Sequence, residues 1–230
     1  MTDTRKQFHQ QLDDLQDSVV MMGDLAEQLV GKAVDAVATG NRALADEVIE
    51  GDNQIDEIYL DAHERWLKVT AEQQPMAVDL RLLTVILHMT VTLERMGDQA
   101  VNIAKIGKLV AGLPVNQTIL SHIQEMADNV RPMVRTALDS FVRRDVDEAK
   151  LLPVMDDPVD RLDNNMHREV MDCRPDPELL EWATHMLMVS RALERVGDQA
   201  VDIGEQVAFL LTGEFQEFSS FPSHGSNGDD

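Results

Sequence analysis

Residues 93–103 read Leu-Glu-Arg-Met-Gly-Asp-Gln-Ala-Val-Asn-Ile, and residues 193–203 read Leu-Glu-Arg-Val-Gly-Asp-Gln-Ala-Val-Asp-Ile. Nine of these eleven positions are identical, at a constant offset of 100 residues. The same offset relates Pro75 to Pro175 and Leu80 to Leu180. Solenoids and propellers repeat every 20–50 residues or so, which makes a period of this length typical of a duplicated domain.

A weaker match precedes this repeat, at an offset of 104 residues. Asp52-x-x-x-Asp56 corresponds to Asp156-x-x-x-Asp160, and His63 corresponds to His167. The chain is therefore predicted to contain two copies of one unit.

The predicted unit is a bundle of three long helices. Apolar residues recur at helical spacing between breaks at Gly40, Pro75, Gly112 to Pro114, and Pro175. We expect helices over about residues 5–39, 42–72, 76–111, 118–144, 146–172 and 178–212. The fold class is all-α, with two tandem pseudo-symmetric three-helix bundles over residues 1–113 and 114–213. The Ser- and Gly-rich segment 214–230 is predicted to be a disordered tail.

Within two of these helices, apolar residues fall in one arc that should form the core. The predicted core positions are Val85, Ile86, Met89, Leu93, Met96, Ala100 and Ile103 in residues 76–111, and Met186, Val189, Leu193, Val196, Ala200, Ile203 and Val207 in residues 178–212.

The composition argues against some classes of binding partner and indicates the cellular compartment. With 42 acidic and 20 basic residues, the net charge of −22 argues against nucleic-acid binding and against docking on anionic lipid. The single cysteine, Cys173, excludes an intramolecular disulfide and a paired-cysteine zinc site. The first residues form no apolar signal core and no apolar run is long enough to span a bilayer, so we expect a soluble cytoplasmic protein.

Acidic side chains form stripes on the helices, on the side away from the predicted core. The stripe positions, each one turn apart, are Glu94, Asp98 and Asn102 in the first half and Glu194, Asp198 and Asp202 in the second. Two further pairs lie on the preceding helices, Asp52 with Asp56 and Asp156 with Asp160. Carboxylates at this spacing can ligate one cation or bridge two, which suits Mg²⁺, Mn²⁺, Fe or Zn.

The alternative to a metal site is a solvated acidic face in an acidic protein. The duplication of the stripes favours metal binding, but the pattern does not establish that acids on different helices meet. Because the second stripe has three carboxylates and the first has two, cations should bind more strongly at the second.

Two other duplicated positions adjoin the stripes. Gly97 and Gly197 cost helix stability, and close approach of a neighbouring helix is favoured over a role in the site. Arg95 and Arg195 either pair with the Asp three residues on, or hold phosphate or an acidic group of a partner.

Leu87 and Leu187 lie near the direction of the acidic stripes. Either they contribute to a partner-binding surface, or a neighbouring helix buries them.

The two copies of the repeated motif resemble the signature of the PhoU family, phosphate-signalling regulators associated with phosphate-specific ABC transporters. The resemblance covers the duplication, the six helices and the length. It implies metal ions at surface Glu/Asp-x-x-x-Asp motifs, sometimes as multinuclear Fe or Zn clusters. The corresponding positions here are Glu94 with Asp98, Glu194 with Asp198, and, less directly, the Asp52 and Asp156 pairs.

The resemblance also implies a function. Such a protein is not an enzyme; it reports phosphate sufficiency from the transporter, through its ATPase subunit, to a membrane histidine kinase. It thereby represses the phosphate-starvation response and restrains phosphate uptake. A homodimer is expected, with membrane contact only through partners.

Two other functions remain open. The first is a metal-dependent hydrolase of phosphate esters, for which His63 or His167 would have to serve as the general base. The second is an accessory protein of an ion-coupled phosphate permease.

Overall fold

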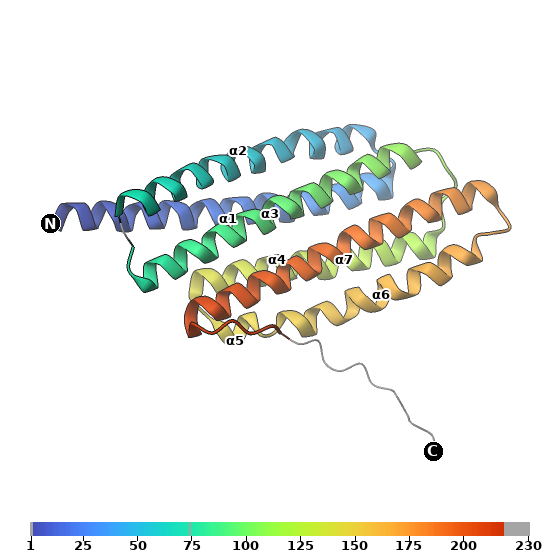
Figure 1. The fold of residues 1–230 in the computed structure, drawn as a ribbon. Helices are drawn as coiled ribbons and strands as arrows, with labels where there is room; N and C mark the ends of the chain where they lie inside the picture. The colour runs from blue at the N-terminus through green and yellow to red at the C-terminus, as the bar shows by residue number, and fades with distance from the viewer. Residues whose placement is uncertain (1, 74, 219–230) are drawn as a thin grey trace, which may run out of the picture.

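The computed structural model describes residues 2–73 and 75–218, and these residues form helices without any strand. The helices are α1 (Thr2–Thr39), α2 (Arg42–Gln73), α3 (Ala77–Val110), α4 (Gln117–Arg143), α5 (Val146–Ala149), α6 (Leu152–Asp172) and α7 (Pro177–Thr212). Figure 1 shows α1–α3 lying beside α4–α7, with the long helices roughly parallel or antiparallel. The predicted fold class is confirmed.

Helix ends follow from local side-chain chemistry. Asn116 starts α4 and Asp176 starts α7, because each side chain accepts hydrogen bonds from two backbone N–H groups of the first turn. Gly213 ends α7 in the left-handed conformation, with φ of 81°.

The predicted helix over residues 146–172 is wrong in one respect, because the chain breaks at Lys150 and Leu151 to give α5 and α6. Pro153 explains the break. Its ring would clash with the carbonyl group of Ala149, where α5 ends, and its missing N–H is harmless in the first turn of α6.

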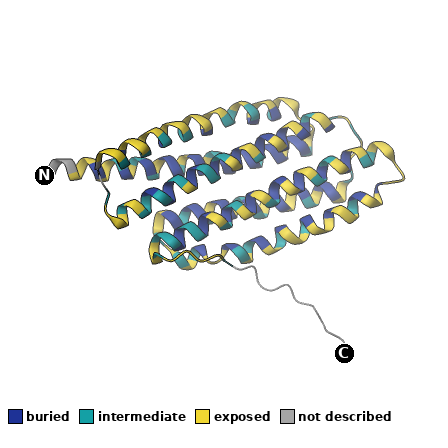
Figure 2. Ribbon diagram, viewed as in Figure 1, coloured by how far each residue is buried: buried dark blue, intermediate teal, exposed yellow. Residues whose placement is uncertain are grey.

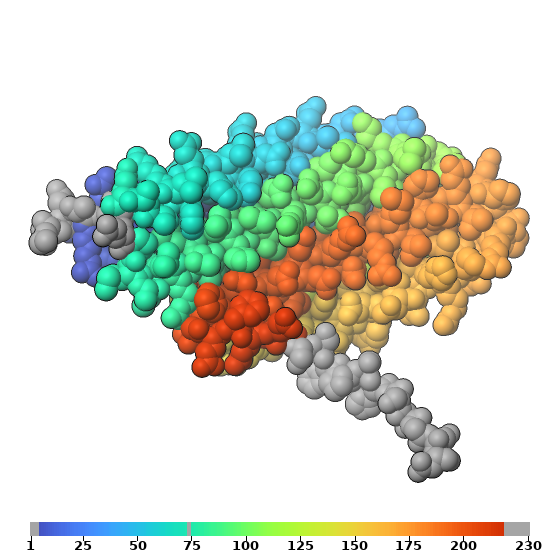
Figure 3. Space-filling model, viewed as in Figure 1, coloured from blue at the N-terminus to red at the C-terminus, as the bar shows by residue number. Residues whose placement is uncertain are grey.

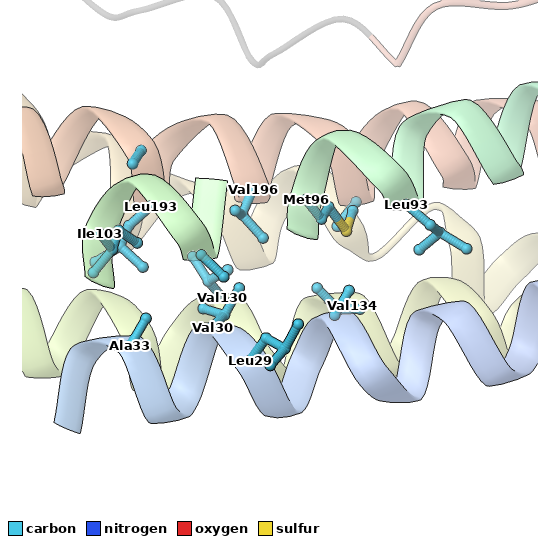
Figure 4. Close-up of a cluster of buried hydrophobic side chains, with 14 of the residues drawn as sticks. Leu29, Val30, Ala33, Leu93, Met96, Ile103, Val130, Val134, Leu193 and Val196 are labelled. Atoms are coloured by element: carbon cyan, nitrogen blue, oxygen red, sulfur yellow. The ribbon is translucent and has the colours of Figure 1, made fainter. Parts of the chain in front are cut away.

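One hydrophobic core runs through both halves. Every core position predicted above for the helices α3 and α7 is buried. Buried faces point inward along each helix (Figure 2). Figure 4 shows where the halves meet, with Leu29, Val30 and Ala33 from α1, Leu93, Met96 and Ile103 from α3, Val130 and Val134 from α4, and Leu193 and Val196 from α7. The α3–α7 and α1–α4 contacts thus join the halves, while α2 packs on its own half and α6 on the other.

A buried ion pair also joins the halves. The Glu27 side chain of α1 is only 8% exposed. Its Oε1 accepts a hydrogen bond of 2.7 Å from Arg131 Nε, and its Oε2 one of 2.9 Å from Arg135 Nη2, both from α4. Two arginines thus compensate one buried carboxylate.

We predict that Glu27→Gln lowers the free energy of unfolding by about 1–3 kcal/mol, because it removes charge-assisted hydrogen bonds across the α1–α4 contact. Urea denaturation measures the change. The matched control is Asp61→Asn, which removes the half-exposed carboxylate paired with Arg65 and should cost less than about 0.5 kcal/mol. Equal losses in the two variants would show that the Glu27 pair does not stabilise the contact.

Among the described residues, no helix combines the length and the apolar character needed to cross a membrane.

Candidate metal centres

The acidic pairs of neighbouring helices meet at the repeated glycines. A Cβ atom added to Gly97 on α3 would collide with Oδ1 of Asp52 on α2, and one added to Gly197 on α7 would collide with Oδ1 of Asp156 on α6. The interpretation of these glycines as points of close approach is confirmed. The close approach also brings a carboxylate of the outer helix onto the acidic stripe of the inner one.

The first carboxylate cluster consists of Asp52, Asp56, Glu94 and Asp98. Burial raises the pKa of Asp52 to about 6, and the neighbouring charges of Asp56, Asp98 and Glu94 contribute to the rise. The pKa of Glu94 is also raised, first by burial and then by Asp98 and Asp56. The carboxylates of α2 and α3 therefore lie close enough to raise each other's pKa, which the helical pattern alone did not establish.

The second carboxylate cluster consists of Asp156, Asp160, Glu194 and Asp198. Burial raises the pKa of Asp156 to about 7, helped by Asp160, Asp198 and Glu194. The pKa values of the other three members are raised too, in each case chiefly by burial. Carboxyl groups here hold their protons more tightly than free side chains do.

Each cluster holds one buried oxygen without a hydrogen-bond donor. Oδ1 of Asp52 and Oδ1 of Asp156 have no such partner within residues 2–73 and 75–218. A buried acceptor without a donor costs free energy, and a cation would remove that cost. The residues thus fit a divalent cation, and the all-oxygen ligand set suits Mg²⁺, Mn²⁺ or Fe better than Zn.

Side-chain positions limit this fit. In the part of the chain that the structure describes, no three His, Cys, Asp or Glu side chains lie close enough together to hold one metal ion. Carboxylates repel one another, so a cation would have to draw them together through side-chain rotations. Metal binding at the ten proposed positions stays a prediction.

The third residue of each stripe, Asn102 or Asp202, is not a member of either carboxylate cluster. Asp202 lines a groove of about 450 Å³ together with Arg95 and Leu87, whereas Asn102 lines a cavity of about 660 Å³ together with Arg195 and Leu187. Burial raises the pKa of Asp202, and Arg95 of the other half opposes this rise. Asp202 also raises the pKa of Asp198, which links it to the second cluster.

The proposed partner-binding residues gather along the contact between α3 and α7. Arg95 and Leu87 lie on α3 and their duplicates Arg195 and Leu187 on α7, and each pair lines a hollow that the other helix completes. Both leucines are half-buried. A neighbouring helix therefore covers part of each leucine, and their role in partner binding stays a prediction.

The two histidines weighed as general bases lie in different surroundings. His63 packs edge-on against Tyr59, with ring centroids 4.8 Å apart, and His167 lines the cavity.

Asp163 is a further acid that the sequence analysis did not single out. It is 3% exposed, accepts a hydrogen bond of 2.8 Å from Ser190 Oγ, and forms an ion pair of 2.5 Å with Arg191. Asp163 also raises the pKa values of Asp160 and Glu194. Its position, three residues after Asp160, was the available signal, since residues three apart share a helix face.

We predict that Gly197→Ala weakens cation binding at the second cluster by about tenfold or more, because the new methyl group displaces the Asp156 carboxylate. Stability should change little, since the gain in helix propensity of about 1 kcal/mol opposes the displacement. Calorimetric titration with Mn²⁺ and urea denaturation measure the two effects. Unchanged affinity would show that Asp156 is not a ligand.

Comparisons with known proteins agree on one family. Residues 19–107 and 123–207 each match the PhoU domain. A phosphate-specific transport system accessory protein PhoU homolog from Aquifex aeolicus is 34% identical over 216 residues, which cover 94% of this chain and 97% of the relative. A protein of the same description from Caulobacter vibrioides is 32% identical over 212 residues, covering 92% of each chain.

Two solved structures have the same fold. The crystal structure of PhoU from Pseudomonas aeruginosa superposes with a TM-score of 0.83 and 33% identity, covering 90% of this chain and 100% of that one. The phosphate transport system regulatory protein PhoU from Streptococcus pneumoniae superposes with a TM-score of 0.82 and 25% identity, covering 91% and 99%.

Proposed function

The chain belongs to the PhoU family, and on that premise we propose that it is an accessory protein of a phosphate-specific transport system and a negative regulator of phosphate uptake. In this proposal it links the transporter ATPase subunit to a phosphate-sensing histidine kinase on the cytoplasmic side of the membrane. The named relatives support the transport association.

The observation that carries the mechanism is the pair of carboxylate clusters, each with an orphaned buried oxygen. Asp52 and Asp56 would hold a cation from α2, and Glu94 and Asp98 from α3. Asp156 and Asp160 of α6 would act with Glu194 and Asp198 of α7 in the same way. A bound divalent cation would supply positive charge that neutralises the carboxylates and ties the outer helix of each half to the inner one.

Cation binding would also change the charge that the surface presents to a partner. The clusters include exposed carboxylates, such as Asp56 and Asp98 in the first half and Asp160 and Asp198 in the second. In a chain of net charge −22, these acids attract basic patches, and such attraction governs association rate more than the lifetime of a complex. Loading the clusters therefore offers a way to tune docking on the kinase or the ATPase.

The test is restoration of repression in phosphate-replete cells that lack the chain. The wild-type chain should silence a phosphate-starvation reporter and capture the ATPase subunit and the kinase in a pull-down. The double variant Asp52→Asn, Asp156→Asn should lose both properties, while the control Asp61→Asn retains them.

Failure of the wild-type chain to repress or to capture either partner would contradict the proposal. Release of phosphate from phosphate esters by the purified chain with Mn²⁺, lost in the double variant, would instead support a hydrolase.

A further inference from the structure

The large cavity lies between the two halves of the molecule. Helix α3 forms one wall, and α7 with α6 forms the other, around a volume of about 660 Å³. Figure 3 shows α3 and α7 crossing the visible face side by side. The cavity lies outside the two carboxylate clusters, since none of their eight members lines it.

Positive charge gathers at this cavity in an acidic chain. Lys105 from α3 and Arg191 and Arg195 from α7 line it. The acid in the lining is Asp163, whose two oxygens are occupied by Ser190 and Arg191. Lys105 and Arg195 form no ion pair with any described residue. Two cationic side chains therefore remain available to an anion.

The groove at the corresponding place on the other side of the α3–α7 contact carries a different charge. The fold alone therefore does not dictate the positive charge of the cavity. At the offset of 100 residues, Glu205 corresponds to Lys105 and Val91 to Arg191, while Arg95 matches Arg195. The groove of about 450 Å³ is thus lined by one arginine and two acids, Asp202 and Glu205. The two hollows thus lie at corresponding places along the α3–α7 contact and differ in the sign of their charge.

The rest of the lining indicates the class of anion. Ile106, Leu187 and Met188 give the cavity apolar wall, and amide side chains such as Asn102 can hydrogen-bond polar groups. Its volume lies in the range of about 300–1,000 Å³ typical of sites for organic ligands, far larger than one phosphate ion. Guanidinium groups match phosphate oxygens in a bidentate arrangement. We propose that this cavity binds a small organic phosphate, such as a nucleotide, with its phosphate held by Arg195 and Lys105.

The test is calorimetric titration of the full chain with AMP, with adenosine and with inorganic phosphate, in EDTA so that no cation bridges phosphate to the clusters. AMP should bind at one site per chain, more tightly than inorganic phosphate, and adenosine should not bind measurably. Arg195→Gln and Lys105→Gln should each weaken AMP binding about tenfold or more, since each removes a charge-assisted contact. Added salt should also weaken it.

The matched control is Arg95→Gln, the equivalent change in the acidic groove, which should leave AMP affinity unchanged. Met188→Ser, on a side chain that is 57% exposed, should weaken AMP binding but not that of inorganic phosphate. Three results would each overturn the proposal: no saturable binding of AMP, inorganic phosphate bound as tightly as AMP, or an equal loss in Arg95→Gln and Arg195→Gln. None of these depends on metal or partner binding.

Discussion

Asp156→Asn is expected to weaken Mn²⁺ binding at the second carboxylate cluster by at least about 100-fold, since even changes to outer partners of a metal ligand cost about 10–100-fold. Asp156 is the most buried acid of either cluster, at 7% exposure, and its Oδ1 has no hydrogen-bond donor among the described residues. An amide keeps the shape but loses the charge.

The same variant should be more stable than the wild-type chain when both are free of metal at pH 8. The folded-state pKa of Asp156, about 7, lies above its ordinary value of 3.8. The native chain therefore binds more protons than the unfolded chain between these values, and its stability falls as pH rises through this window. An uncharged Asn removes that loss.

Urea denaturation in EDTA at pH 8, together with Mn²⁺ titration, checks both effects, with Asp61→Asn, a half-exposed acid outside both clusters, as the control. A variant that is less stable without metal and binds Mn²⁺ as the wild-type chain does would contradict the metal account.

The second large effect concerns pH. Cations compete with protons for carboxylates, so affinity should rise as the clusters deprotonate. With the pKa of Asp156 at about 7, Mn²⁺ affinity at the second cluster should rise about tenfold between pH 6 and pH 8. With the pKa of Asp52 at about 6, the first cluster should gain only about twofold.

Titrations of the Asp52→Asn and Asp156→Asn variants at the two pH values isolate each cluster. No pH dependence in either variant would show that these two aspartates do not lose protons when a cation binds, and an equal dependence in both would contradict the predicted difference between the clusters.

Stronger binding at the second cluster is still expected, but for a different reason from the sequence argument. The third carboxylate of the second stripe, Asp202, lies in the groove beside Arg95. The additional acids are Asp157, which raises the pKa of Asp156, and Asp163, which raises that of Glu194.

The duplicated motif was enough to predict the architecture. Helical apolar spacing placed Leu93 and Leu193 in the core, because burial of one helix face is a local property of the pattern. The break before Pro153 was missed, because proline is tolerated both in a first turn and, as at Pro158, inside a helix, so its presence alone does not fix a boundary.

The placement of the acids along each helix was predictable from the sequence, and their assembly into clusters across helices was not. The spacing of Glu94 and Asp98 gives their positions on one helix, but it says nothing of how that helix is rotated against α2. Asp52 can approach α3 because Gly97 has no side chain, and a Cβ atom there would collide with Oδ1 of Asp52. The cavity was missed because Lys105 and Arg195 are 90 residues apart and meet only through the α3–α7 contact.

The central claim is that each half holds a cation at its carboxylate cluster. The most direct measurement is an anomalous difference map from crystals soaked in Mn²⁺ at pH 8. We expect one peak or a close pair of peaks among Asp52, Asp56, Glu94 and Asp98, and another among Asp156, Asp160, Glu194 and Asp198, with the second filled at the lower concentration. Peaks only at other acids, or none at either cluster, would contradict the account.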